Sequence, residues 1–313
     1  MTSVLSRRTA MKAAAICTGA ALLPQPRTVE ASDAGDPTFG RKLVFDENFA
    51  MLDPDVWFAG PKATTFDGGF YGRSAFSRIS GEEGIIPYAI VDDGKAEDGK
   101  ALEISAHYVG RKMSVPNYYG NDLPEYQWIS GNIQTARRDG TIMKGWRNGY
   151  FEARMHMPSH PLSFPAFWLM NGRSILYPQT STELDVVEHK GWENRLYGTY
   201  LHEWGEPGKH NEGAGVATQP DLTTGYFRYG MLVDGDRVTS YFERQPAIDV
   251  ANGKPIAWTI ERVEQLDTHN DVFWPLLTLA LRDDVKFPQP LSEGDRKTRL
   301  LIDYFRVYAS DGG

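Results

Sequence analysis

The chain has 313 residues and a formal net charge of −8, and 41% of its residues are hydrophobic. This length is enough for one large domain with its own core. The acidic balance argues against nucleic acid or an anionic membrane surface as the main partner, because both recruit lysine and arginine. The single cysteine, Cys17, lies near the N-terminus, which excludes a thiol nucleophile or a cysteine-based zinc site in the rest of the chain.

Residues 1–31 have the pattern of an export signal. Arg7-Arg8 and Lys12 precede a short apolar run, 13–23, and Val29-Glu30-Ala31 offers a small-residue cleavage site. A membrane span needs about 20 apolar residues, so we expect a removable signal rather than a stable membrane anchor or a buried helix. The arginine pair resembles the twin-arginine type, which predicts a periplasmic or extracellular protein.

After a predicted flexible segment, residues 32–40, the sequence indicates one domain over 41–309. Its strand signals alternate with turn signals such as Asp98-Gly99 and Asn171-Gly172, and no segment has a long 3.6-residue period. The expected strands are Lys42–Phe49, Ala101–Tyr108, Gly149–Met157, Glu183–His189, Tyr197–His202, Tyr226–Leu232, Thr239–Arg244, Phe273–Leu281 and Leu300–Tyr308. Many strands without crossover helices predict an all-β fold, a two-sheet antiparallel sandwich of the jelly-roll kind.

The strand around residues 181–189 carries three acids. Glu183 and Asp185 are two residues apart and therefore share one face. Glu188 is five residues from Glu183, so a regular strand would turn it to the other face. One extra residue at Val186-Val187, a β-bulge, would bring it back. The two glutamate carboxyl groups could then approach to about 5–5.5 Å, the separation found in retaining glycosidases.

Three like charges on one face cannot all ionise easily, so at least one pKa must rise. That asymmetry supplies one carboxylate that attacks and one carboxylic acid that donates a proton. The alternative interpretation is a solvated acidic edge strand. The apolar residues Leu184, Val186 and Val187 argue against it, because they indicate a strand with a buried side.

The segment Glu183-Leu-Asp-Val-Val-Glu188 resembles the active-site signature of glycoside hydrolase family 16, in its bulged form. The resemblance covers roughly residues 41–309. Further matching motifs, in chain order, are Phe45–Phe49 with Trp57, Asp98-Gly99 with Leu102–Ile104, Ser130–Thr135, Asn148–Arg154, Pro165–Met170 and Leu301–Tyr308.

This resemblance implies a concanavalin-like jelly roll with an open cleft on its concave face. It implies endo-acting hydrolysis of β-linked polysaccharides with retention of configuration. Carried over by position, Glu183 is the nucleophile, and Glu188 protonates the leaving oxygen and then activates water. Asp185 would hold Glu183 and help to set its protonation.

The chain departs from the pattern of many glucan-cleaving family members at two places near the acids. Many glucan-cleaving members have Trp-Pro-Ala where this chain has Phe164-Pro165-Ala166, and a glycine that often precedes the first glutamate is replaced by Thr182. The resemblance implies a β-1,3-glucan as the first expectation for the substrate, and Phe164 argues against it. A galactan or a bacterial exopolysaccharide remains open.

Sugar binding needs aromatic platforms and polar side chains. Trp168, just upstream of the catalytic strand, is the first candidate, and His202 and Trp204 follow on the next strand and loop. Trp128 and Trp146 are further candidates. For each of these residues the alternative is packing in the core.

Many family members hold a calcium ion between their first and last strands. The matching positions are Glu47, Gly99 and Asp303, whose oxygen atoms suit calcium. A salt bridge or hydrogen bond at Asp303 is the alternative. The chemistry itself requires no cofactor.

Three other functions compete with hydrolysis. A non-catalytic lectin on the same sandwich has no need of three aligned acids, and neither has a structural cell-envelope protein. A transglycosylase would use the same residues and differ only in its products. The expected partner is a polysaccharide substrate, and we expect a monomer.

Overall fold

The structure is a computed structural model that describes residues 35–63, 70–71, 74–114, 125–177, 181–205, 210–261, 272–282 and 291–310. The chain divides into two units, Met1–Ser32 and Asp33–Gly313. The first unit, which contains the whole predicted signal, lies outside the described residues, so the signal and its boundary stay predictions. Residues 36–40 of the expected flexible segment form a turn that is closed by backbone hydrogen bonds.

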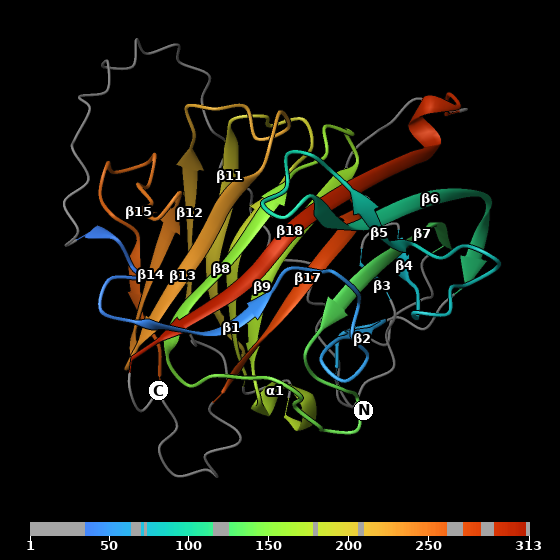
Figure 1. Ribbon diagram of the computed structural model, residues 1–313. Coiled ribbons are helices and arrows are strands. Elements are labelled where there is room, and N and C mark those ends of the chain that lie inside the picture. Colours follow the sequence, from blue (N-terminus) through green and yellow to red (C-terminus); the bar gives the residue numbers. More distant parts are fainter. Residues whose placement is uncertain are drawn as a thin grey trace, which may run out of the picture. The chain divides into compact units, whose positions relative to one another are not determined.

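One layer of the second unit, sheet A, is built around the long strand β18 (Lys297–Ala309). On one side β18 pairs with β8 (Gly149–His156), and its two halves pair on the other side with β6 and β1. The remaining order can be followed in Figure 1. The other strands of this layer are β1 (Lys42–Glu47), β5 (Tyr88–Asp92), β6 (Lys100–Ser114), β13 (Phe227–Asp234), β14 (Arg237–Phe242), β15 (Gln245–Pro246) and β16 (Ala257–Thr259).

The second layer, sheet B, has the order β2–β7–β17–β9–β10–β11–β12. Its strands are β2 (Phe58–Ala59), β7 (Glu125–Gln134), β17 (Phe273–Leu281), β9 (Ser163–Asn171), β10 (Thr182–His189), β11 (Leu196–Glu203) and β12 (Asn211–Ala217). β7 also pairs with β6 and so joins the two layers. Two short strands, β3 (Phe70–Tyr71) and β4 (Ser74–Phe76), lie beside this junction, and β4 pairs with β7 in parallel.

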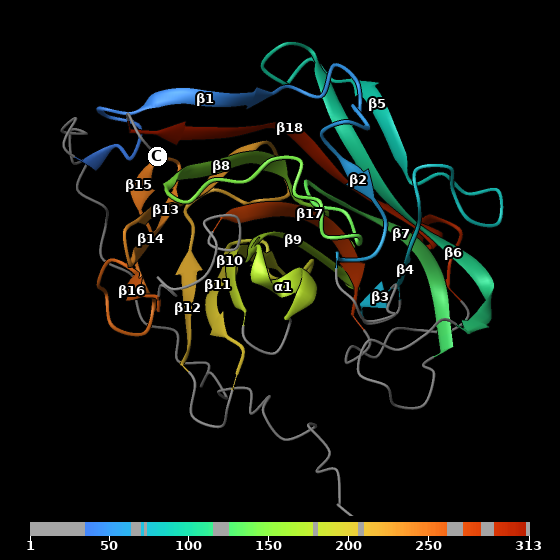
Figure 2. The same ribbon diagram turned by 90° about the horizontal axis from the view of Figure 1, so that it is seen from below.

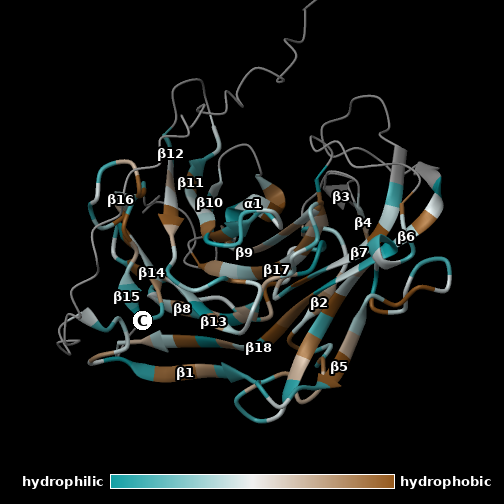
Figure 3. Cartoon of the chain, turned by 90° about the horizontal axis from the view of Figure 1, so that it is seen from above, coloured by the Kyte–Doolittle hydropathy of each residue, from teal (hydrophilic) through white to brown (hydrophobic). Residues whose placement is uncertain are grey.

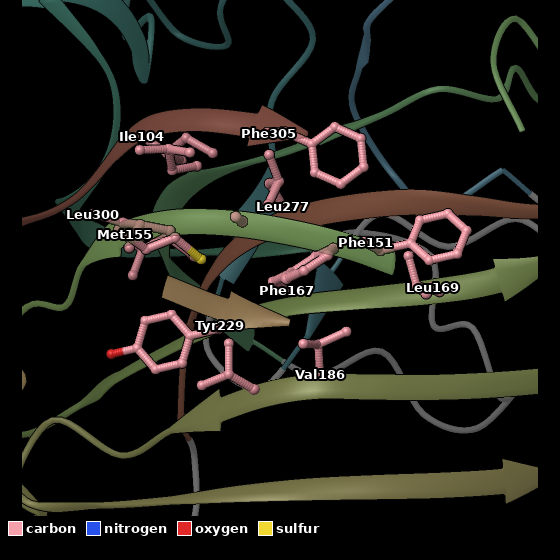
Figure 4. Packing of buried hydrophobic residues seen from close by; sticks show 14 of the residues in the cluster. Ile104, Phe151, Met155, Phe167, Leu169, Val186, Tyr229, Leu277, Leu300 and Phe305 are labelled. Carbon is pink, nitrogen blue, oxygen red and sulfur yellow. The ribbon is translucent and has the colours of Figure 1, made fainter. Parts of the chain in front are cut away.

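The two layers curl around one core, as the expected jelly roll requires. Phe151, Ala153 and Met155 of β8, which the sequence places on one strand face, are all fully buried. They meet Phe167 of β9 and Phe305 of β18 between the layers (Figure 4). Apolar segments run along the inner strands in Figure 3, and polar residues are frequent in the surrounding loops. The prediction of a two-sheet antiparallel sandwich is confirmed.

The outer side of sheet B carries the short helix α1 (Arg173–Leu176), which Figure 2 places on the side facing away from sheet A. Ile175 of this helix packs with Met170 and Trp274 in a second, smaller apolar cluster. The helix therefore covers part of the face that carries the three acids. A single-turn 3-10 helix, Gly294–Arg296, precedes β18.

Strand β9 is absent from the expected strands. Eight of its nine residues are buried, so it has no alternation of polar and apolar residues to detect. It also contains Pro165, which lacks the N–H that a central strand needs. The register explains this proline, because the pairing of β9 with β10 ends at Ala166 and Pro165 has a partner only on β17.

Candidate active site

The predicted bulge on β10 is present. Asp185 pairs with Tyr200 on β11, and Glu188 pairs with Gly198, so three steps on β10 match two steps on β11. On the other side, Asp185 and Glu188 pair with Trp168 and Ala166 of β9, again with one extra residue on β10. Residues two apart on a strand share a face. The bulge therefore places Glu188 on the same face as Asp185.

This face points away from sheet A. Leu184, Val186 and Val187 are fully buried in the core between the layers, which leaves the acids on the outer face of sheet B. A bulge interrupts the hydrogen bonds of the ladder. Here the hydroxyl of Thr199 donates to the backbone carbonyl of Asp185 at 2.7 Å and so satisfies a buried acceptor at the bulge.

The surroundings of the site raise the pKa of two of the three acids, Asp185 and Glu188. Asp185 is 2% exposed, and burial raises its pKa well above the ordinary range, with further contributions from Glu183 and Glu188. Burial, followed by the charge of Glu183, raises the pKa of Glu188 to about 7, while Arg282 and Lys190 act in the opposite direction. A carboxylic acid with a pKa near neutrality is suited to general acid catalysis.

Glu183 has a different set of contacts. The indole Nε1 of Trp204 donates to its Oε2 at 2.9 Å. An indole can only donate, so this oxygen of Glu183 is the acceptor. His202 lies opposite Glu183 in the β11 register, and its Nε2 is 3.4 Å from Asp185 Oδ2. The other ring nitrogen, Nδ1, lies 2.9 Å from Asn211 Oδ1 on β12.

Tyr200 was not among the predicted site residues, and its ring completes a row of stacked rings along β11. The rings of Tyr200 and His202 are 5.9 Å apart and those of His202 and Trp204 are 5.4 Å apart, both nearly parallel. A Cβ atom on Gly198 or Gly213 would meet the Tyr200 ring at 2.5 and 2.6 Å, so these glycines leave room for the ring to lie on the sheet. The period-2 spacing of the three rings was the available signal.

Trp168 lies next to the acids on β9, where it pairs with Asp185. It is partly buried, and its Nε1 donates to Thr278 Oγ1 at 2.9 Å. Lys62 Nζ lies 5.6 Å from the centre of its ring, and the same cation lowers the pKa of Asp185. The structure thus brings together Trp168, His202 and Trp204 with the three acids.

Solved structures that share this fold include catalytic domains of glucanases. A laminarinase catalytic domain from Thermotoga petrophila matches with a TM-score of 0.60 and 21% identity, over 87% of this chain and 99% of that one. SCLam, described as a non-specific endo-β-1,3(4)-glucanase from family GH16, matches with a TM-score of 0.59 and 17% identity, over 86% and 91% of the two chains. The fold is that of glycoside hydrolase family 16.

Two curated sequences are also similar to this chain. The chain is 24% identical over 277 residues to endo-1,3-1,4-β-glycanase EglC of Rhizobium meliloti, which is 87% of this chain and 50% of that protein. It is 28% identical over 191 residues to ExsH of the same organism, 61% of this chain and 35% of that protein. The chain thus spans about half the length, or less, of the curated relatives that it matches. No family model matches the chain.

Two of the expected sugar-binding residues are wrong. Trp128 is 1% exposed, and its ring packs against Tyr108 and His160, so no sugar can reach it. Trp146 packs against Phe45 and Phe151 of sheet A, at 5.2 and 6.1 Å between ring centres. It therefore lies on the core side of the sandwich, away from the acids. Sequence could not separate these two residues from Trp168, because all three lie on or beside apolar strands.

The three residues expected to hold calcium all have hydrogen-bond or ion-pair partners within the chain. Asp303 is paired with the guanidinium of Arg154 and accepts from the backbone N–H of Glu97 at 3.0 Å. Both oxygens of the Glu47 carboxylate accept N–H groups, and the Gly99 carbonyl accepts another at 3.0 Å. Asp303 therefore makes the salt bridge that was the alternative, and calcium stays an untested prediction.

Another group of residues has the spacing of metal ligands. Within the described ranges, Glu183, Asp185 and His202 each offer one such atom, all within 4.8 Å of one another. Trp204 and Asn211 already contact two members of the group, and we interpret it as part of the acid site.

None of the helices in the described ranges has the length and apolar character needed to cross a bilayer.

Proposed function

We propose that this chain cleaves internal β-1,3 or mixed β-1,3/1,4 bonds of a β-glycan, with retention of configuration. The observation that carries the proposal is the bulge on β10, which places Asp185 and Glu188 on one face while Glu188 is held near a pKa of about 7. The Rhizobium meliloti relatives are described as endo-1,3-1,4-β-glycanases. An SCLam mutant, 19% identical with a TM-score of 0.58, presents 1,3-β-D-cellobiosyl-glucose at its active site.

Each acid has one role in this proposal. Glu183 attacks the anomeric carbon and forms a glycosyl-enzyme, while the protonated Glu188 donates its proton to the leaving oxygen. Ionised Glu188 then takes a proton from water, which releases the sugar with its original configuration. Asp185 is a positioning residue that stays protonated between the two glutamates and limits their mutual repulsion.

The roles of Glu183 and Glu188 can be separated with azide. We expect Glu183→Ala and Glu188→Ala each to lose at least about a hundredfold in kcat/KM on laminarin. With an activated aryl β-glycoside and azide, Glu183→Ala should give the α-glycosyl azide, because azide replaces the nucleophile. Glu188→Ala should give the β-glycosyl azide, because azide attacks the intermediate.

A matched control is Asp92→Asn, an exposed acid on β5 of the other sheet, which should keep full activity. If wild type releases no oligosaccharide from laminarin, lichenan, agarose or a bacterial exopolysaccharide but binds one of them, the protein is a lectin. Longer products than the substrate would identify a transglycosylase.

We also propose that the protein is exported. The supporting feature is the arginine pair Arg7-Arg8 before the apolar run 13–23. Replacing both arginines with lysine should keep the protein in the cytoplasm of a bacterial host with a twin-arginine system, as fractionation would detect. Unchanged export of that variant would contradict the twin-arginine assignment.

A further inference from the structure

Aromatic and cationic side chains gather at the end of sheet B beyond Glu188. In the sheet register, Glu188 lies beside Ala166 of β9, and β9 and β17 continue together for three more pairs past this point. At this end β10 runs into a turn, β9 begins and β17 ends. We call the four side chains there the Arg282 cluster: Phe164, Lys190, Trp192 and Arg282.

The Arg282 cluster has a defined geometry. The guanidinium carbon of Arg282 lies 5.2 Å from the ring centre of Phe164 and 5.2 Å from that of Trp192. Lys190 Nζ lies 6.0 Å from the ring centre of Trp192 and 3.8 Å from Oε2 of Glu193, with which it forms an ion pair at the edge of the cluster. Phe164 is 6% exposed, whereas Trp192 is 43% exposed and offers a ring surface to a ligand.

The turn that carries Lys190 and Trp192 is held in place by Gly191. A Cβ atom at this position would lie 1.9 Å from the backbone oxygen of His160, so only glycine fits. The N–H of Gly191 also donates to the carbonyl of Ser163 at 3.1 Å. The two side chains thus project from a fixed turn, and a ligand would meet a preorganised site.

The chemistry of the proposed reaction assigns this end of the site to the leaving group. In a displacement at the anomeric carbon, the nucleophile and the leaving oxygen lie on opposite sides of that carbon, and the acid lies beside the leaving oxygen. Going from Glu183 towards Glu188 therefore leads from the attacked sugar to the departing one. The Arg282 cluster lies further in the same direction.

Acid catalysis alone does not account for these cations. Arg282 and Lys190 favour the ionised form of Glu188, whereas a general acid must be protonated before it acts. A bound anion would weaken this unfavourable effect. The chain has a net charge of −8 and would repel an anionic polymer as a whole. A local group of cations would attract such a polymer to this end of the site.

We propose that the Arg282 cluster is a leaving-group subsite for a sugar that carries a carboxylate substituent, so that the preferred substrate is an anionic β-glycan. The guanidinium fork of Arg282 matches a carboxylate, and Lys190, which is shared with Glu193, adds a weaker second attraction. The exposed ring of Trp192 stacks against the apolar face of the same sugar. This inference rests on the proposed function, which it narrows to a substrate class.

The test compares laminarin with partially carboxymethylated laminarin at low salt. Wild type should have a kcat/KM about tenfold higher on the carboxymethylated polymer, or more, and the preference should shrink in high salt. Arg282→Gln and Lys190→Gln should each reduce the preference, and the double variant should abolish it. Lys254→Gln, an exposed cation between β15 and β16 and outside the Arg282 cluster, is the matched control and should keep the preference.

Binding by the Glu183→Gln form separates the two proposals. If wild type cleaves both polymers equally, or if the preference survives in Arg282→Gln/Lys190→Gln, the subsite is refuted while the glycanase stands. If neither polymer is cleaved, the proposed function fails, and binding then decides the subsite. Tighter binding of the carboxymethylated polymer that depends on Arg282 would support it, and equal binding would refute it. Arg282→Lys, which keeps the charge without the fork, covers the case in which Arg282→Gln does not fold.

Discussion

Burial of Glu188 should cost the protein stability in a way that depends on pH. Its pKa is raised from about 4.5 to about 7 in the folded state. The pKa of this carboxyl group is higher in the folded than in the unfolded protein. At a pH below the pKa of the unfolded protein, the group is protonated in both states and costs no folding stability. The loss grows as pH rises through the interval between the two values and is complete above the folded pKa. Replacing Glu188 with glutamine removes this loss.

The size of the effect follows from the two pKa values. A difference of about two and a half units corresponds to roughly 3 kcal/mol. We therefore expect Glu188→Gln to gain roughly 3 kcal/mol more in unfolding free energy at about pH 8.5 than at about pH 4, each measured relative to wild type. For a domain of this size, that gain corresponds to roughly 5–10 °C in Tm.

Urea unfolding at the two pH values, with wild type, Glu188→Gln and Asp92→Asn in parallel, measures this difference. Changes in packing contribute equally at both pH values and cancel, so the comparison reports the ionisation of Glu188 together with its coupling to Glu183 and Asp185. Asp92 has a side chain that is 90% exposed, and its variant should behave alike at both pH values. A gain for Glu188→Gln that is the same at both pH values would refute the account of Glu188 as a buried acid.

Three further predictions concern the site and its support. The kcat/KM should fall as pH rises through about 7, because Glu188 loses the proton that it donates. A pH–rate profile that does not fall in this range would contradict the role of Glu188 as general acid. Thr199→Val should lower the unfolding free energy by about 1–3 kcal/mol and reduce kcat, because the backbone carbonyl of Asp185 loses its hydrogen-bond donor. Denaturant unfolding and steady-state kinetics test this prediction. Unchanged values would show that Thr199 does not support the bulge. Arg244→Met should cost about 3–5 kcal/mol in denaturant unfolding, since it leaves the fully buried Glu152 without its bidentate partner, and a loss below 1 kcal/mol would contradict this.

Local sequence determined the fold class and the acid site. Strand signals depend on residues a few positions apart, and β17 was predicted with its observed bounds, Phe273–Leu281. The spacing of Glu183, Asp185 and Glu188, with apolar residues between them, was enough to require a bulge if all three were to share a face. These features follow from backbone geometry, which repeats every two residues along a strand.

Only the tertiary structure decided which residues surround the acids. Trp128 and Trp168 are both tryptophans on strands, and they differ only in which face of the folded sheet each one meets. Strand β9 escaped detection because its burial on both sides comes from neighbours distant in sequence. The Arg282 cluster brings Arg282 to Phe164, 118 positions away, and to Trp192, 90 positions away, and their meeting depends on the register of β9, β10 and β17. The register between strands distant in sequence cannot be predicted from a local pattern, because long-range packing determines it.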